Sequence, residues 1–302
     1  MGKRGLRRSI GKKSALLQIV LASILACAVP SNAQAGISSG EFTADTEMSE
    51  AQDNTDGILT PQEEGASEND SGSKWREKNN GFYYYENKKA VTGLCEINGK
   101  FYLFNKKGRQ QNGWQKYKDG YYFFHTANGK KGYMAVSEKV NGIRLAKDGK
   151  AVLTAESRTK LDVLIKANEI VQKATKPAMD KAEKLRKSFD YLLSHYKYRG
   201  SPDFENSSRW EQEYAMAMFK EGHGNCYAYG AAFAFLANAV GYKECYAVSS
   251  GGHGWAEVNG RVYDPSWSLI DKRNSYFGVS FDLSGKGGRP NYKRARRYVA
   301  KI

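Results

Sequence analysis

The stretch GNCYAYGAAFAFLANAVG, residues 224–241, decides the fold of the C-terminal half of the chain. Its only cysteine, Cys226, stands in front of an apolar, alanine-rich run. Gly224 and Asn225 break or cap structure before that run and Gly241 ends it, which predicts a buried helix with Cys226 at its N-terminus. The unpaired amides and the dipole at a helix start favour negative charge. Because a thiol reacts as its thiolate, this position favours a reactive cysteine over a merely packed one.

Four histidines are available to take a proton from that thiol. His253 follows glycines in SSGGHGWAEVNG, at the predicted start of a strand. His125 lies among repeats and His195 near the end of a predicted helix. His223 is close to the cysteine in sequence, but a loop position makes it a less rigid partner. We therefore expect His253 to be the partner of the thiol, since an imidazole beside it can accept and return its proton.

A carboxylate follows the histidine at a spacing that a hairpin can close. Asp264 stands in RVYDPSW, and a turn at Asn259-Gly260 joins the two predicted strands. A turn centred between these two residues places position 253 opposite about position 266, close to Asp264. An aspartate in this place can orient the imidazole and stabilise its charged form.

Cysteine at a helix start, histidine on one strand and aspartate on the next resemble the triad of the transglutaminase-like superfamily of papain-type folds. The segment KAEKLRKSFDYLLSHYKYRG, residues 181–200, resembles the helix before the cysteine in that family. The resemblance covers roughly residues 180–270. It implies that Cys226 is the nucleophile, His253 the base and then the acid, and Asp264 the residue that orients it. A catalytically inactive relative is the alternative, and a metal site built from the same three residues lacks the usual ligand pairing.

The oxyanion donors are less clearly marked in the sequence. The backbone amide of Cys226 is one candidate. A side chain such as Trp210 or Gln212 is a possible second donor, although a core role is favoured for Trp210. We expect a packing role for the remaining residues of interest, with either tryptophan as an alternative wall of the cleft: Cys245, Trp255 and Trp267.

The chain is predicted to have four parts. Residues 1–35 are typical of a signal peptide, with six Lys or Arg residues, an apolar run and small residues at 33–35. Residues 36–73 hold ten acidic residues and no Lys or Arg, which predicts a disordered acidic linker. Residues 74–152 are repetitive, and residues 153–302 are the predicted catalytic domain.

The catalytic part is predicted to be an α+β domain. Apolar residues recur at helical spacing from Leu161 to Tyr196 and are interrupted at Pro177, so two helices or one kinked helix are expected. A short helix around 210–219 and the helix after Cys226 follow. The segments ECYAVSSG, HGWAEVNG and RVYDPSWSL then alternate like antiparallel strands. Helices followed by antiparallel strands make an α+β fold.

The repetitive part places a turn glycine at 81, 99, 120 and 142, each beside a short aromatic run. Asn-Gly or Asp-Gly against alternating apolar residues is the hairpin signal, and one hairpin cannot bury its own face, so several must stack. Fifteen aromatic residues in 79 exceed the needs of an ordinary core, and we expect some rings on the outer face.

These repeats resemble the cell-wall or choline-binding repeats of Gram-positive surface proteins, above all in GWQKYKDGYYFFHTANGKKG, residues 113–132. In that family, aromatic residues from successive hairpins build the ligand cages. The match is partial here, because only Trp114 follows the expected glycine, and Ile143 and Leu145 stand where rings would be. We therefore expect the repeats to attach the protein to the wall or to a carbohydrate. A purely structural spacer is the alternative, and choline itself is not favoured as the ligand.

Charge and cysteine count narrow the classes of partner. The net charge is +15, although the linker is acidic, so the remainder is strongly basic and suited to anionic wall polymers. Nucleic acid is a poor alternative, since no binding motif is present. Removal of the signal leaves three cysteines, an odd number that rules out full disulfide pairing. The best candidate patch for an anionic polymer lies in the tail from Lys286 to Lys301: Arg289, Lys293, Arg294, Arg296 and Arg297.

Taken together, the sequence predicts a secreted, cell-wall-associated, transglutaminase-like thiol enzyme acting on peptide or isopeptide amide bonds through a Cys226 thioester. Hydrolysis, as a cysteine peptidase or amidase, is favoured over protein crosslinking by a transglutaminase. A non-catalytic cell-surface binding protein is the alternative from another class. The expected partners are a peptide or protein substrate and a cell-wall polysaccharide or teichoic acid. No cofactor, metal or nucleic acid is expected, and no stable membrane span in the mature form.

Overall fold

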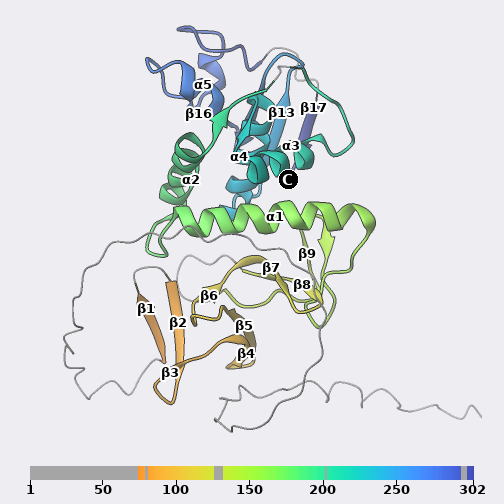
Figure 1. The fold of residues 1–302 in the computed structure, drawn as a ribbon, viewed down its shortest axis with the longest axis vertical. Helices are drawn as coiled ribbons and strands as arrows, with labels where there is room; N and C mark the ends of the chain where they lie inside the picture. The colour runs from red at the N-terminus through yellow and green to blue at the C-terminus, as the bar shows by residue number, and fades with distance from the viewer. Residues whose placement is uncertain (1–73, 79–80, 126–131, 201–202, 294–297) are drawn as a thin grey trace, which may run out of the picture. The chain divides into compact units, whose positions relative to one another are not determined.

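A computed structural model describes residues 74–78, 81–125, 132–200, 203–293 and 298–302. These residues fall within one compact unit. The predicted signal peptide and acidic linker lie outside the described residues. The predicted fold class is confirmed: short β-hairpins come first, and a mixed helical and antiparallel part follows (Figure 1).

Short antiparallel hairpins make up the first part of the described chain. Three sheets of two or three strands follow one another, with order β1-β2-β3, β4-β5-β6 and β7-β8, and a further pair joins β9 to β10. Their bounds are β1 Trp75–Lys78, β2 Gly81–Glu86, β3 Lys89–Ala90, β4 Gly93–Ile97, β5 Lys100–Phe104, β6 Gln110–Gln111, β7 Gly113–Tyr117, β8 Gly120–Phe124, β9 Lys139–Val140 and β10 Ile143–Arg144.

The predicted Asn-Gly turns are confirmed at 98–99 and 141–142, where both residues of each pair have positive φ, as a type I′ turn requires. The turn expected at Asp119-Gly120 is wrong by one residue. It falls on Lys118 and Asp119, and Gly120 opens β8 instead. A Cβ at Gly120 would lie 2.7 Å from the ring of Tyr122, so a larger residue there would require the tyrosine ring to move.

Most aromatic rings of the hairpins are buried, so the expected outer face of exposed rings is largely wrong. Of the fifteen aromatic residues, all of them described, only Phe101 and Tyr133 count as exposed. The rings instead pack between successive hairpins. Trp75 of β1 meets the edges of Tyr84 in β2 and Tyr102 in β5, with ring centroids 5.2 and 5.3 Å apart. Such pairs stabilise the array beyond the area they bury.

Two separate helices follow the hairpins, which settles the choice between two helices and one kinked helix. α1 spans Ala155–Ala174 and α2 spans Lys181–His195, with Pro177 in the connection. Each begins with a reciprocal capping box, Thr154 with Ser157 and Asp180 with Glu183. No described helix is both long and apolar enough to cross a membrane.

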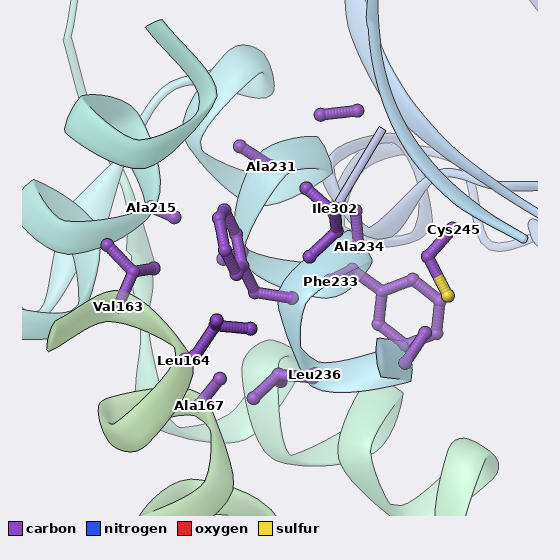
Figure 2. Close-up of a cluster of buried hydrophobic side chains, with 14 of the residues drawn as sticks. Val163, Leu164, Ala167, Ala215, Ala231, Phe233, Ala234, Leu236, Cys245 and Ile302 are labelled. Carbon is purple, nitrogen blue, oxygen red and sulfur yellow. The ribbon is translucent and has the colours of Figure 1, made fainter. Parts of the chain in front are cut away.

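The predicted central helix is confirmed as α4, Cys226–Val240. The side chain of Asn225 caps it by accepting from the amide of Ala228 at 3.1 Å, and Gly241 ends it with φ of 108°. Most of its side chains are buried, since it packs against α1, α2 and α3 (Trp210–Glu221) as well as β13 and β14. Figure 2 shows this core, drawn from four elements and the C-terminus: Val163, Leu164 and Ala167 of α1, Ala215 of α3, Ala231, Phe233, Ala234 and Leu236 of α4, Cys245 of β13 and Ile302.

An antiparallel sheet of five strands packs against α4, in the order β16-β15-β14-β13-β17. The predicted turn at 259–260 is confirmed, since Val258 pairs with Arg261 and Ala256 with Tyr263. The C-terminal strand returns to the edge of the sheet beside β13. The remaining bounds are β11 Lys197–Tyr198, β12 His223–Gly224, β13 Cys245–Ser249, β14 Gly254–Val258, β15 Arg261–Tyr263, α5 Pro265–Ile270, β16 Phe277–Val279, η1 Phe281–Leu283 and β17 Tyr298–Lys301.

Two glycines allow α4 to approach β14 closely. A Cβ at Gly230 would lie 2.7 Å from the backbone of Trp255, and a Cβ at Gly254 would lie 2.7 Å from the Cα of Tyr227. Both contacts involve backbone atoms, which cannot move aside as the end of a long side chain can. This close packing brings the start of α4 next to the start of β14.

The hairpins are joined to the helices by a chain of side-chain hydrogen bonds. The indole Nε1 of Trp114 in β7 donates to Asn141 Oδ1 at 2.9 Å, and Asn141 Nδ2 donates to Asn238 Oδ1 in α4 at 2.9 Å. Asn168 of α1 also donates to the carbonyl of Asn112 at 2.6 Å. α1 therefore contacts β7 as well as α4 (Figure 1).

Candidate active site

Cys226 is the first residue of α4, and it is a free thiol with 4% of its surface exposed. Its place follows from the sequence around it, since Asn225 takes the N-cap and the alanine-rich run continues the helix into the core. The sulfur therefore lies at the end of the helix where unpaired amides favour negative charge.

His253 and Asp264 form the shortest polar contact of this region. His253 directly precedes β14, and its Nε2 lies 2.6 Å from Oδ2 of Asp264. The carboxylate is fully buried, whereas 18% of the histidine side chain is exposed. Because Asp264 engages Nε2, the other ring nitrogen, Nδ1, is left for a partner on the thiol side.

The carboxylate of Asp264 is held by four groups. Oδ2 also accepts from the hydroxyl of Tyr292 at 3.0 Å, while Oδ1 accepts from the hydroxyl of Ser266 at 2.8 Å and from the amide of Trp267 at 3.1 Å. The last of these bonds makes Asp264 the N-cap of α5. A carboxylate bonded in this way has one fixed orientation toward the imidazole.

The pKa of His253 reflects competing effects. Burial lowers it, but the charge of Asp264, its hydrogen bond and the nearby side chain of Cys226 raise it to about 10. The charged imidazolium is thereby favoured over the neutral ring. A thiol, an imidazole and a carboxylate thus form one connected series, Cys226 to His253 to Asp264.

A tyrosine that the sequence reasoning missed lies near the sulfur. Tyr198 ends β11, which runs parallel to β12, and it pairs with Gly224 just before the cysteine. Its phenol is close enough to Cys226 for the two groups to interact electrostatically. Burial and the nearby Cys226 raise the pKa of Tyr198, so the phenol stays neutral and keeps its proton. The side chain remains 44% exposed.

The other three histidines have partners elsewhere. His125 lies 3.2 Å from Glu138, and His195 stacks on Tyr191 with ring centroids 3.7 Å apart. His223, which the sequence left as a less rigid alternative, lies 3.7 Å from Glu221.

The two side chains suggested as oxyanion donors, Trp210 and Gln212, make other contacts. Trp210 is 4% exposed and packs edge-to-face on Phe204, which supports a core role. Gln212 is also buried, and its amide donates to Glu211 at 3.0 Å. Neither has a hydrogen bond to Cys226 among the described residues.

The remaining cysteine and tryptophans of interest divide between core and site. Cys245 is fully buried in the apolar cluster of Figure 2, and burial raises the pKa of its thiol to about 12. The rings of Trp255 and Trp267 flank His253, with centroids 5.9 and 6.3 Å from the imidazole. In the part of the chain that the structure describes, no group of three or more His, Cys, Asp or Glu residues is placed to hold a metal ion.

Comparison with known protein families gives two matches. Residues 167–271 match the transglutaminase-like superfamily, and residues 91–134 match the choline-binding repeat. No curated protein matches the chain significantly.

Three of the solved structures similar to the chain come from Streptococcus pneumoniae. The choline binding domain of Spr1274 is 26% identical over 28% of this chain and 98% of its own, with a TM-score of 0.25. Choline binding protein F is 25% identical over 27% of each chain, with a TM-score of 0.25. CbpJ is 24% identical over 27% of each chain, with a TM-score of 0.24. The chain therefore spans only about a quarter of the length of the last two.

The family matches cover the two parts that carry the features described above. The choline-binding repeat lies in the hairpins, and the superfamily match contains the thiol, the imidazole and the carboxylate. The chain thus combines choline-binding repeats, which indicate a cell-wall-associated surface protein, with a core domain of the transglutaminase-like superfamily.

Proposed function

We propose that the protein is a thiol enzyme of the cell wall that cleaves peptide or isopeptide amide bonds through a thioester at Cys226. One observation carries the proposal: His253 is hydrogen-bonded to the buried Asp264, and the thiol at the start of α4 lies close enough to raise the pKa of the same imidazole, which is the order of groups that nucleophilic catalysis requires. Crosslinking, in which an amine replaces water, uses the same intermediate and is distinguished below by its product.

In the first step, the sulfur of Cys226, having given its proton to Nδ1 of His253, attacks the carbonyl carbon of the amide. The carbon–nitrogen bond of the tetrahedral intermediate then breaks, and His253 returns the proton to the departing amine. Asp264 holds the imidazole in place while it is charged.

In the second step, His253 takes a proton from water, and the resulting hydroxide attacks the thioester. The carbon–sulfur bond breaks, which releases a carboxylic acid, and His253 returns its proton to the sulfur and so restores the thiol. The negative charge on the carbonyl oxygen needs donors in both steps. The backbone amide of Cys226 is one, and the neutral phenol of Tyr198, which lies near Cys226, is our proposed second donor.

The repeats supply the location of this chemistry. We propose that they attach the protein to a cell-wall polysaccharide or teichoic acid, with choline as the group to test first because the matching family is named for it. Asn141 and Asn168 join the hairpins to the helices by hydrogen bonds, so attachment at the repeats would hold the thiol domain near the wall.

Alkylation of Cys226 by iodoacetamide at pH 7, followed by peptide mass mapping, tests the proposed nucleophile. We expect Cys226 to react faster than a free model thiol despite its burial, and His253→Ala to abolish the advantage. His195→Ala is the matched control, since His195 stacks on Tyr191 at the surface. A rate no faster than the model thiol, together with no effect of His253→Ala, would instead indicate a non-catalytic surface protein.

Incubation with a glutamine-containing peptide and a labelled primary amine separates hydrolysis from transfer. Hydrolysis releases ammonia or peptide fragments without incorporating the label, whereas crosslinking places the label on the peptide. A Cys226→Ala variant controls for both products, because neither can form without the sulfur.

A further inference from the structure

A cavity of about 100 Å³ lies away from the thiol, where the hairpins meet α1, α2 and the end of α4. A buried water needs about 10–15 Å³ on a comparable measure, so the space holds a group of several atoms. No Asp or Glu is among the described residues that line it. Four cationic side chains are: Arg109, Lys176, Lys181 and Lys184.

Arg109 is the cation that most lacks a partner. It is half-buried, and its side chain lies against Gly81, where an added Cβ would be 2.6 Å from the arginine Cγ. Burial lowers the pKa of its guanidinium. Within the described residues its side chain has neither an ion pair nor a hydrogen bond. Because burying a charge without a partner costs free energy, this guanidinium suits an anion that enters the cavity.

The lysines also lack a neutralising carboxylate. Lys181 Nζ donates to the carbonyl of Gly241 at 2.8 Å, and Lys184 Nζ donates to that of Pro177 at 3.3 Å. Burial lowers the pKa of Lys184 even though Asp180 and Glu183 are nearby. Those two carboxylates form the capping box of α2 and do not line the cavity. The cavity therefore keeps its positive charge.

Two amide oxygens of the lining are also unsatisfied. Gln110 is 5% exposed, and its Oε1 has no hydrogen-bond partner among the described atoms; neither has Oδ1 of Asn112. A buried acceptor left unpaired is costly, and an anion cannot satisfy it. Both oxygens are themselves inaccessible to solvent, so a group that enters the cavity does not reach them. The lining therefore offers an entering group its cationic donors.

We propose that this cavity binds a phosphate group. The phosphate contacts Arg109 and the lysines. The site is separate from the thiol, and it stands whether or not Cys226 is catalytic. Because it lies between the hairpins and the helices, a bound phosphate bridges the two parts.

Calorimetric titration of the full chain with glycerol 3-phosphate tests the site. We expect saturable binding that Arg109→Gln weakens at least tenfold, while Lys187→Gln, which removes an exposed lysine of α2 outside the cavity, leaves it unchanged. Inorganic phosphate should compete with glycerol 3-phosphate for the same site, because the expected contacts are to the phosphate group. Absence of saturable binding, or equal affinity in the wild type and Arg109→Gln, overturns the proposal.

Thermal unfolding provides an independent measurement. Removing an unpaired, half-buried charge should leave the melting temperature of ligand-free Arg109→Gln equal to or above that of the wild type. Glycerol 3-phosphate should raise the melting temperature of the wild type and not that of the variant. If Arg109→Gln fails to fold, Lys184→Gln takes its place with the same expected loss of binding. Tighter binding of polyglycerol phosphate than of the monomer would indicate a wall polymer as the source, and equal binding a free metabolite.

Discussion

Replacing Asp264 with Asn tests the electrostatics of the site, because it removes a charge while keeping the shape of the side chain. The charge and hydrogen bond of Asp264 outweigh burial and hold the pKa of His253 at about 10, against an ordinary value of 6.5. A difference of this size corresponds to about 5 kcal/mol in favour of the imidazolium. Without the charge, burial remains as the largest effect, so we expect the pKa of His253 to fall to 6.5 or below.

The same pKa determines how stability depends on pH. Below pH 6.5, His253 is protonated in both the folded and the unfolded protein, and the ion pair contributes fully. Between pH 6.5 and 10 the unfolded chain has lost a proton that the folded protein keeps, so this contribution declines as pH rises. The wild type should lose up to about 5 kcal/mol of unfolding free energy from this group over that range. Asp264→Asn should not show this decline.

Urea unfolding between pH 6 and 10 measures this effect, and NMR titration of the imidazole measures the pKa directly. Asparagine is as good an N-cap as aspartate, so α5 keeps its cap in the variant. Asp190→Asn is the control, since it breaks an exposed pair with Arg186 worth little to stability. The reasoning is refuted if His253 titrates near pH 6.5 in the wild type, or near pH 10 in Asp264→Asn.

Three further substitutions test the surroundings of the site. Gly254→Ala forces α4 and β14 apart, so it should lower the free energy of unfolding by about 1–3 kcal/mol and abolish the fast alkylation of Cys226. Gly142→Ala is the control. It strains a turn of positive φ but has open space around it, so it should leave alkylation of Cys226 unchanged. Tyr198→Phe should slow acylation of Cys226 by an ester substrate on the order of 100-fold without altering its melting temperature, and an unchanged rate would remove Tyr198 as a donor. Asn141→Ala leaves the buried indole of Trp114 unpaired and should cost about 1–3 kcal/mol in urea unfolding, a loss that would be absent if the link contributed nothing.

The series from Cys226 to Asp264 could be anticipated because its geometry is largely local. A cap and an apolar run place the cysteine at a helix start, and the Asn259-Gly260 turn fixes which residues of the two strands are opposite. Only the approach of α4 to β14 is long-range. The glycines at 230 and 254 that permit it carry no signal in a single sequence that distinguishes them from turn glycines.

The two tyrosines of the site could not be found in this way. Tyr198 reaches Cys226 through a two-residue parallel pairing between β11 and β12, far too short to leave a periodic pattern. The burial of the aromatic rings in the hairpins could not be predicted for a similar reason. The composition gives the number of rings, but whether a ring is buried depends on which hairpin packs against it, as the contact between Trp75 and Tyr102 illustrates.

Tyr292 changes how the C-terminal segment is understood. The sequence suggested a basic tail for anionic polymers, and three of its arginines, at 294, 296 and 297, lie outside the described residues. Tyr292 itself is fully buried, donates to Asp264, and packs edge-on against Trp255. β17 then adds a strand beside β13. The C-terminal segment therefore helps to hold the carboxylate that orients His253, so a polymer bound to its arginines would act on a segment connected to the proposed active site.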